Sequence, residues 1–283
     1  MSTAAVIQMT SSADVQDNLR TATALLHEAA QRGARLAALP ENFALMGMSD
    51  RDKFAIAEQD GDGPIQQWLA ELARELNLWI VAGTLPIKLP NEPRVAAASL
   101  VVNAQGERVA RYDKIHLFDV EVDDATRSYR ESATIAPGQR VVVVDTPIGK
   151  LGLAVCYDVR FPELFRELSA QGAEVLVLPS AFTVPTGQAH WDVLLRARAV
   201  ENLCYLLAPA QSGKHANGRE TYGHSMIVEP WGEVLTRLLD GPGVAVAEID
   251  LVKQRERRQR FQALSHRRLN INRHPRTGGD PVE

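Results

Sequence analysis

Short apolar runs alternate with amphipathic stretches along almost the whole chain, and this alternation restricts the possible folds more than any other feature. Ala4–Met9 and Leu36–Leu39 are apolar runs of strand length, and Asp17–Arg32 between them repeats its apolar residues at helical spacing. The second half shows the same pattern, with a helix predicted over Pro162–Gln171 between two apolar runs. Strand–helix–strand alternation favours a sheet that is covered by helices.

Two predicted hairpins indicate that the sheet is mixed rather than purely parallel. Ala97–Val102 leads through the turn Asn103–Gly106 into Glu107–Tyr112, and Val141–Val144 is joined to Leu151–Val155 by another short turn. We therefore predict an α/β fold, with residues 1–270 as a single domain and 271–283 as a C-terminal tail. The other predicted elements are a helix from Pro64, a helix over Ala189–Asn202, and strands over Leu78–Ala82, Val175–Leu178, Cys204–Ala208, His224–Val228 and Val244–Ile249.

Charge and cysteine content exclude several classes of protein. The net charge of -4 gives no basic surplus for nucleic acid or anionic lipid, and the locally basic stretch Lys253–Arg276 is interpreted as a solvated helix face and tail. No apolar run reaches the length of a membrane span, and the start of the chain does not resemble a signal peptide. Because Cys156 and Cys204 are the only cysteines, we expect a reducing cytoplasmic location.

In three places a chemically reactive side chain directly follows a predicted strand. Glu41 follows Pro40, Lys114 follows a strand that ends in Tyr112, and Cys156 stands between the end of a strand and the helix that begins at Pro162. Sites in α/β sheets form where strands end and loops begin, so these three side chains are placed to meet. The strand–turn–helix layout around Cys156 is also that of a nucleophile elbow.

Each of the three residues also has an ordinary structural interpretation. Cys156 fits an inert core thiol, Lys114 a surface lysine and Glu41 a helix cap or a solvated acid. Together they form a sufficient set for amide hydrolysis through a thioester. A carboxylate can accept the thiol proton, and an ammonium can stabilise the negative charge on the carbonyl oxygen.

The segments Leu39-Pro40-Glu41, Tyr112 to Leu117 and Val155 to Glu163, taken in this order, resemble the nitrilase superfamily. The resemblance extends to about Leu269. It implies an α-β-β-α four-layer sandwich, doubled in a homodimer. We expect no cofactor and no metal. It also implies roles for site residues: Glu41 as general base, Lys114 as oxyanion stabiliser, Cys156 as nucleophile, Tyr157 as the donor of a second oxyanion N–H, and Glu131 as a positioning acid.

The run Asp158 to Leu164 and the segment Thr183–His190 resemble the branch that includes ω-amidase and deaminated glutathione amidase. The resemblance implies hydrolysis of deaminated glutathione to 2-oxoglutarate and cysteinylglycine. An ω-amidase acting on 2-oxoglutaramate or 2-oxosuccinamate, a carbamoylase and an aliphatic amidase are the alternatives. Arg160 is predicted to bind the substrate carboxylate, with an ion pair to a neighbouring acid as its structural alternative. Phe182 and Thr186 are predicted to line the same pocket or to serve core packing and loop capping.

Other kinds of site and function compete with this interpretation. A Cys–His pair could use His116, His190 or His224, although His116 would point away from Lys114 on a strand, His190 would start a helix and His224 would lie on a strand. No Cys or His pair has short zinc-ligand spacing. Acyl transfer to an amine and a catalytically silent interaction protein also remain alternatives. We expect a small-molecule amide as the partner, and neither nucleic acid nor membrane.

Overall fold

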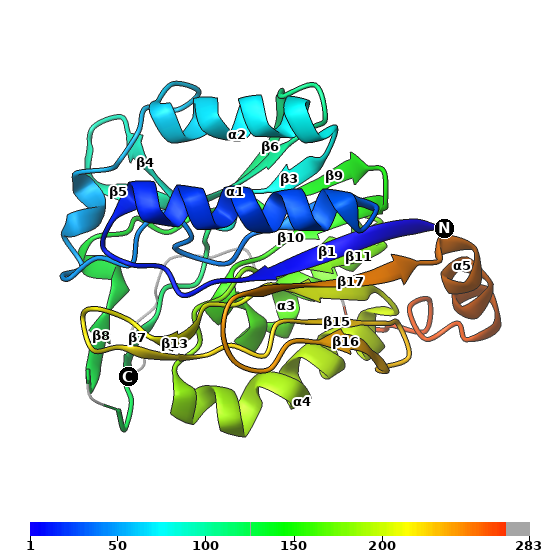
Figure 1. Ribbon diagram of the computed structural model, residues 1–283. Coiled ribbons are helices and arrows are strands. Elements are labelled where there is room, and N and C mark those ends of the chain that lie inside the picture. Colours follow the sequence, from blue (N-terminus) through cyan, green and yellow to red (C-terminus); the bar gives the residue numbers. More distant parts are fainter. Residues whose placement is uncertain (125, 270–283) are drawn as a thin grey trace, which may run out of the picture.

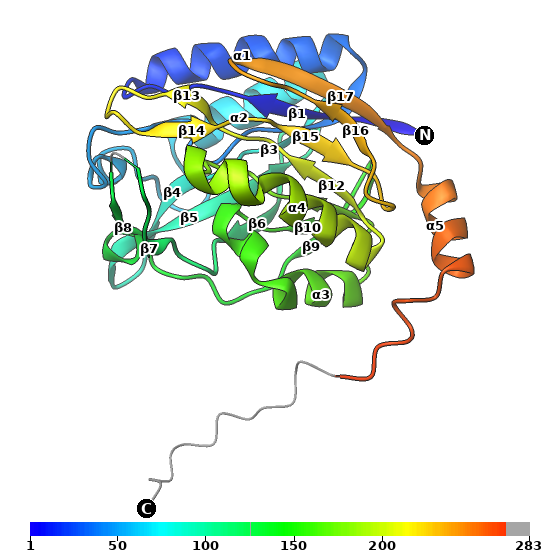
Figure 2. The same cartoon turned by 90° about the horizontal axis from the view of Figure 1, so that it is seen from below.

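The computed structural model describes residues 1–124 and 126–269 of the chain, in which two β-sheets face each other and helices cover their outer sides. Helices α1 (Val15–Gln31) and α2 (Pro64–Leu76) pack on the first sheet, and α3 (Pro162–Ala170) and α4 (Val184–Asn202) pack on the second. Figures 1 and 2 show this order of layers from two directions. The predicted α-β-β-α sandwich with mixed sheets is confirmed.

The first sheet has the strand order β17-β1-β2-β3-β5-β4, and β6 also pairs with β5. Strand β2 runs parallel to both β1 and β3, whereas the other neighbours are antiparallel. The strands are β1 (Ser2–Gln8), β2 (Ala34–Ala38), β3 (Trp79–Val81), β4 (Leu85–Leu89), β5 (Glu92–Val102), β6 (Arg108–Asp113) and β17 (Gly243–Ile249).

The second sheet has the order β16-β15-β12-β11-β10-β9, with a parallel centre of β10, β11 and β12. Two small hairpins, β7 with β8 and β13 with β14, lie outside both sheets. The strands are β7 (Asp119–Glu121), β8 (Ser128–Arg130), β9 (Val143–Thr146), β10 (Gly149–Leu153), β11 (Val175–Val177), β12 (Tyr205–Ala208), β13 (Ser212–Lys214), β14 (Glu220–Tyr222), β15 (Met226–Val228) and β16 (Val234–Arg237).

The continuous apolar character of β1 follows from its burial on both faces. Ala4 and Val6 belong to the core that lies between the two sheets, whereas Ala5 and Ile7 belong to the core beneath α1 and α2. Alternate residues of a strand point to opposite faces, so a strand inside a sandwich needs apolar residues at every position. This explains why the sequence shows unbroken apolar runs rather than strict alternation.

Several predicted boundaries are wrong, with consequences for the histidines. Helix α4 begins at Val184 instead of Ala189, so His190 lies inside the helix and does not start it. Strand β6 ends at Asp113, so His116 and Lys114 both follow the strand and the alternation argument does not apply. His224 precedes β15 and has a positive φ of 57°. The strands that were not predicted are short or polar: β4, β7, β8, β13, β14 and β16.

The basic segment after β17 forms α5 (Leu251–Arg260), which is not fully solvated, because the buried Gln254 donates to the carbonyls of Glu174 and Leu203, just before β11 and β12. Arg255 forms an ion pair of 2.8 Å with Glu174, and Arg257 pairs with Glu229. The predicted tail 271–283 lies outside the described residues. Of the helices in the described part of the chain, none is both long and apolar enough to cross a membrane.

Candidate active site

Glu41 lies just beyond the carboxyl end of β2, where the backbone is tightly confined. Gly83, with a φ of +35°, passes so close that a Cβ there would lie 1.8 Å from the carbonyl oxygen of Pro40. The backbone N–H of Asn42 donates to Oγ1 of Thr84 at 2.9 Å. The side chain of Glu41 is 6% exposed. The close packing on both sides of the residue fixes the direction in which its carboxylate points.

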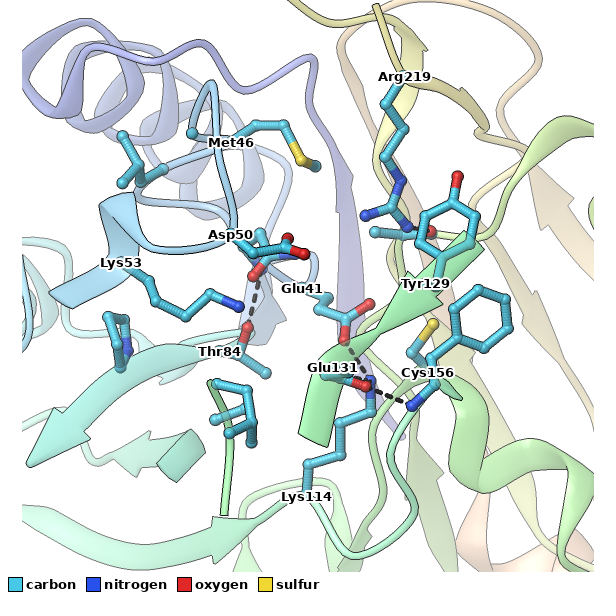
Figure 3. Close-up of a pocket in the computed structure, with 18 of the residues that line it drawn as sticks. Glu41, Met46, Asp50, Lys53, Thr84, Lys114, Tyr129, Glu131, Cys156 and Arg219 are labelled. Carbon is cyan, nitrogen blue, oxygen red and sulfur yellow. Dashed lines mark hydrogen bonds and ion pairs between the residues drawn. The ribbon is translucent and has the colours of Figure 1, made fainter. Parts of the chain in front are cut away.

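Lys114 is held in the same way beyond the end of β6. Its backbone N–H donates to Ala97 at 3.0 Å, and its carbonyl accepts from Gly138 at 2.8 Å. Its side chain is only 2% exposed, and Nζ lies 2.8 Å from Oε1 of Glu41 and 2.9 Å from both carboxylate oxygens of Glu131. Figure 3 shows this ammonium between the two carboxylates. The structure therefore brings together Glu41, Lys114 and Glu131 in one buried cluster.

Glu131 begins the short 3₁₀ helix Glu131–Ala133, and its carboxylate has a second donor besides Lys114. Oε2 accepts the backbone N–H of Phe118 at 2.7 Å. A carboxylate with a backbone donor and a cation has little freedom to rotate. This geometry is that of an acid that orients the ammonium of Lys114.

Cys156 stands at a strained turn between β10 and α3. The residue has a φ of 47°, in the left-handed region that L-residues seldom adopt, and its backbone N–H donates to Pro179 at 2.9 Å. It opens the 3₁₀ helix Cys156–Arg160, which leads directly into α3. Strain of this kind is found at nucleophile elbows, where it exposes the side chain at the sheet edge. The predicted strand–turn–helix layout is present.

A buried carboxylate joins the segment of Lys114 to the turn of Cys156. Asp158, which is 0% exposed, accepts the hydroxyl hydrogen of Tyr112 at 2.7 Å and the backbone N–H of Val155 at 2.8 Å. It also contacts His116, through the backbone N–H at 3.0 Å and through Nδ1 at 2.7 Å. The two chain segments are therefore fixed relative to each other through Asp158.

Burial and charge shift the pKa values of the cluster in opposite directions. Burial alone would raise the pKa of Glu41, but the adjacent Lys114 outweighs it and holds this pKa below 4.5. Burial would lower the pKa of Lys114, but Glu131 and Glu41 raise it well above 10.5. Burial and Glu41 raise the pKa of the Cys156 thiol, and Lys114 lowers it. At neutral pH the site therefore holds a thiol beside a carboxylate that can accept its proton.

These side chains open into a cavity of about 330 Å³, a size suited to a small molecule. Glu41, Lys114, Glu131, Cys156 and Tyr157 all line it. An acid, an ammonium and a thiol around one cavity can attack a carbonyl carbon, stabilise the oxyanion and protonate a leaving amine.

The structure brings only part of the predicted substrate-binding set into this cavity. Phe182 and Thr186 line it, but Arg160 does not. The guanidinium of Arg160 lies 5.7 Å from the ring centroid of Phe182 and 5.9 Å from that of Tyr157, and it contacts Nδ1 of His190 at 3.3 Å. The predicted ion pair of Arg160 with a neighbouring acid does not form among the described residues. Arg160 therefore contacts two aromatic residues of the cavity wall without lining the cavity itself.

Besides Lys114, the cavity is lined by the cations Lys53, Arg130 and Arg219, and none of these three was predicted from the sequence. Lys53 reaches it from the short 3₁₀ helix Asp52–Phe54, and Arg219 reaches it from the segment that precedes β14. The Nε of Arg219 is buried without a hydrogen-bond partner, and its guanidinium lies 5.3 Å from the ring centroid of Tyr129. Neither Lys53 nor Arg219 directly follows a strand that the sequence predicts, so no sequence signal distinguished them from surface cations.

The competing Cys–His and zinc sites gain no support from the geometry. His116 contacts Asp158 and stacks on Phe161 with ring centroids 3.7 Å apart, and His190 contacts Arg160. No histidine between residues 1 and 269 lines the cavity. Within the same range, no group of three or more His, Cys, Asp or Glu side chains is placed to hold a metal ion.

A four-layer sandwich with a thiol, an acid and a lysine in one cavity is an arrangement suited to a hydrolase. A family model described as carbon-nitrogen hydrolase matches residues 3–259. The chain belongs to the carbon-nitrogen hydrolase family, within the nitrilase superfamily, and is an amidase that acts on carbon–nitrogen bonds other than peptide bonds.

Relatives agree with this assignment over almost the full chain. The chain is 42% identical to deaminated glutathione amidase of Yersinia enterocolitica over 266 residues, which is 94% of this chain and 92% of the relative. It is also 42% identical to the human protein of the same name over 270 residues, covering 94% of this chain and 82% of the relative.

Solved structures show the same fold. The Caenorhabditis elegans NitFhit protein superimposes with a TM-score of 0.87 at 39% identity; the match covers 94% of this chain and 65% of that longer chain. Saccharomyces cerevisiae Nit3, a member of branch 10 of the nitrilase superfamily, superimposes with a TM-score of 0.82 at 29% identity, covering 92% and 93% of the two chains.

Proposed function

We propose that this amidase hydrolyses deaminated glutathione to 2-oxoglutarate and cysteinylglycine, with Cys156 as nucleophile. The observation that carries the proposal is the combination of the buried Glu41–Lys114–Cys156 cavity with full-length relatives named deaminated glutathione amidase. A 2-oxo acid amide is anionic at neutral pH, and the cavity has cationic residues besides Lys114 to receive it.

The first half-reaction forms the thioester. Glu41 accepts the proton of Cys156 while the sulfur bonds to the amide carbon, and the oxyanion is stabilised by Nζ of Lys114 and the backbone N–H of Tyr157. Glu41 then returns the proton to the amide nitrogen, the carbon–nitrogen bond breaks, and the amine leaves. Lys114 stays charged throughout because its pKa is far above neutrality, and Glu131 keeps it in place.

The second half-reaction releases the acid. Glu41, again ionised, accepts a proton from water as the water oxygen bonds to the thioester carbon. The carbon–sulfur bond breaks, and the thiolate of Cys156 regains the proton from Glu41. Each group ends in its starting state, so no cofactor is required.

The acyl end of the substrate is proposed to lie against Phe182 and Thr186, both of which line the cavity. We retain Arg160 as the proposed partner of the oxo-acid carboxylate. Its guanidinium rests on two rings of the cavity wall, and His190 is its only hydrogen-bond partner within the described chain. Arg219, which already lines the cavity, is the competing candidate.

The test compares product release from deaminated glutathione, 2-oxoglutaramate and a neutral aliphatic amide. We expect the highest kcat/KM for deaminated glutathione, no turnover by Cys156→Ser, and an acyl adduct on Cys156 in rapidly quenched wild-type enzyme. The matched control is Cys204→Ser, because Cys204 is also a buried free thiol but does not line the cavity. Higher kcat/KM for 2-oxoglutaramate would assign ω-amidase activity instead.

A homodimer and a cytoplasmic location are also proposed. Both cysteines are free thiols, which suits a reducing compartment. Light scattering coupled to size exclusion tests the first proposal, and fractionation of the producing cells tests the second. A monomer in solution or a secreted enzyme would contradict them.

A further inference from the structure

Lys53 is a cation of the cavity that has no role in the proposed mechanism. Lys53 belongs to the 3₁₀ helix Asp52–Phe54 and lines the cavity together with Met46, Asp50 and Ile56. Figure 3 shows its side chain entering from the side opposite Cys156, with Glu41 and Glu131 between them. The cavity therefore continues beyond the acids, away from the nucleophile, and a cation is present in this second arm.

The ammonium of Lys53 lacks an ion-pair partner. It donates one hydrogen bond, to Oγ1 of Thr134 at 2.9 Å, and none of the carboxylates in the described chain forms an ion pair with it. An ammonium has three donors, so two remain available for a ligand. Desolvation lowers the pKa of Lys53, although Asp50 and Glu131 act in the opposite direction. A partly buried, unpaired cation that lines a cavity is suited to bind an anion.

The proposed mechanism determines which part of the substrate reaches this arm. Glu41 returns a proton to the amide nitrogen, so the nitrogen lies on the Glu41 side of the attacked carbon. A substituent on that nitrogen would leave the reacting centre on the Glu41 side, which is the side where Figure 3 shows Lys53. The nitrogen of a primary amide carries no substituent that could occupy this arm. An amide of a peptide-like amine carries one, and that substituent ends in a carboxylate.

We infer that Lys53 binds a carboxylate carried by the leaving amine, which makes the enzyme selective for amides with an acidic peptide-like substituent on nitrogen. The inference rests on the proposed function and deepens it. It assigns to the arm beyond Glu41 a subsite for the leaving group, separate from the wall formed by Phe182 and Thr186. Met46 and Ile56 supply apolar surface for the part of the amine between the nitrogen and its carboxylate.

The experiment measures kcat/KM for three amides of the same oxo acid: deaminated glutathione, its C-terminal carboxamide and 2-oxoglutaramate. The wild-type enzyme should prefer the free acid to the carboxamide by about tenfold or more, as expected for one charge-assisted hydrogen bond. Lys53→Met should abolish that preference. It should also lower the ratio of kcat/KM for deaminated glutathione to kcat/KM for 2-oxoglutaramate by a similar factor. Lys53→Arg should restore much of it.

The matched control is Lys88→Met on the exposed part of β4, which should leave the ratio unchanged. Asp50→Asn tests whether Lys53 acts only through the charge of the nearby Asp50. If Asp50→Asn and Lys53→Met lower the ratio of kcat/KM for deaminated glutathione to that for 2-oxoglutaramate equally, the inference is overturned. Equal losses of Lys53→Met on all three amides would also overturn it, while leaving the proposed function intact. A wild-type enzyme that turns over only 2-oxoglutaramate would contradict both.

Discussion

The hydroxyl of Tyr112 donates to the carboxylate of Asp158 at 2.7 Å, and this hydrogen bond connects the strand before Lys114 to the turn that holds Cys156. Both residues are buried, and burial together with Asp158 raises the pKa of Tyr112 well above 10.0, so the hydroxyl stays a donor. The relative position of ammonium and thiol therefore depends on residues that do not line the cavity.

Tyr112→Phe should lower kcat about tenfold while changing KM little, because small displacements of reacting groups are costly in rate. It should also destabilise the fold by about 1–3 kcal/mol, since a buried acceptor loses a donor. Steady-state kinetics and urea unfolding measure the two effects. Tyr205→Phe is the control, since the Tyr205 hydroxyl accepts from Asp250 at 3.2 Å, away from the cavity. An unchanged kcat at reduced stability would limit Tyr112 to a structural role.

The pKa of the Cys156 thiol should shift in opposite directions when each of its two charged neighbours is replaced. Burial is the largest cause of its raised pKa, Glu41 adds to it and Lys114 opposes it. Glu41→Gln should therefore lower the thiol pKa, and Lys114→Met should raise it. The measurement is the pH dependence of alkylation at Cys156, read by mass spectrometry so that Cys204 is distinguished. Shifts of the same sign in both variants would disprove this electrostatic account.

The two substitutions should also differ in their cost to stability. The buried cluster of Glu41, Lys114 and Glu131 contains two negative charges and one positive charge. Glu41→Gln leaves a balanced pair, whereas Lys114→Met leaves one buried and one partly buried carboxylate without a cation. We expect Lys114→Met to cost about 3–5 kcal/mol, as for other broken buried pairs, and Glu41→Gln to cost less. Chemical denaturation at neutral pH gives the comparison; the reverse order would argue that the cluster is not fully ionised.

The charges of Glu41 and Lys114 also set the pH range over which both residues stabilise the fold. The folded pKa of Glu41 lies below 4.5, so its stabilising contribution is present above pH 4.5 and is lost as the pH falls through the folded value. The folded pKa of Lys114 lies above 10.5, so its contribution is present below pH 10.5 and is lost as the pH rises through the folded value. The stability difference between wild type and Glu41→Gln should be constant across this pH range and shrink below it. A difference that changes between pH 6 and 9 would contradict the assignment.

Patterns in the sequence predicted a mixed sheet covered by helices and the catalytic candidates for a physical reason, whereas the four-layer sandwich was implied by the family resemblance. Strands buried on both faces leave continuous apolar runs, and reactive side chains directly after such runs are conspicuous, as for Cys156 after β10 and Lys114 after β6. Short strands such as β13 and β14 were missed because they lie outside both sheets and need no apolar pattern. The ion pair between Lys114 and Glu41 was not predicted, since no local pattern links residues 73 positions apart.

The orientation of single cations could not be predicted, and Arg160 illustrates why. The direction of the Arg160 side chain is set by the rings of Tyr157 and Phe182 and by His190 of α4, which is 30 residues away in the chain. Lys53 and Arg219 reach the cavity through loops whose course depends on the packing of the whole sandwich. In such cases the tertiary surroundings determine the direction of a side chain, and the residue type gives only its charge.

Arg160 and Arg219 can be separated by their effects on different substrates. Arg219 lowers the pKa of Glu41 through its charge, so it acts on the group that transfers the proton for every amide. Arg160 has no such connection, and its proposed role is limited to the oxo-acid carboxylate. Arg160→Ala should lower kcat/KM about tenfold or more for 2-oxoglutaramate and deaminated glutathione, with little change for a neutral amide. Arg219→Ala should lower kcat/KM for all three and move the acid limb of the rate profile to higher pH. If instead Arg219→Ala lowers kcat/KM only for the oxo-acid amides and Arg160→Ala does not, the carboxylate is bound by Arg219. The buried Nε of Arg219 lacks a hydrogen-bond partner in the described chain.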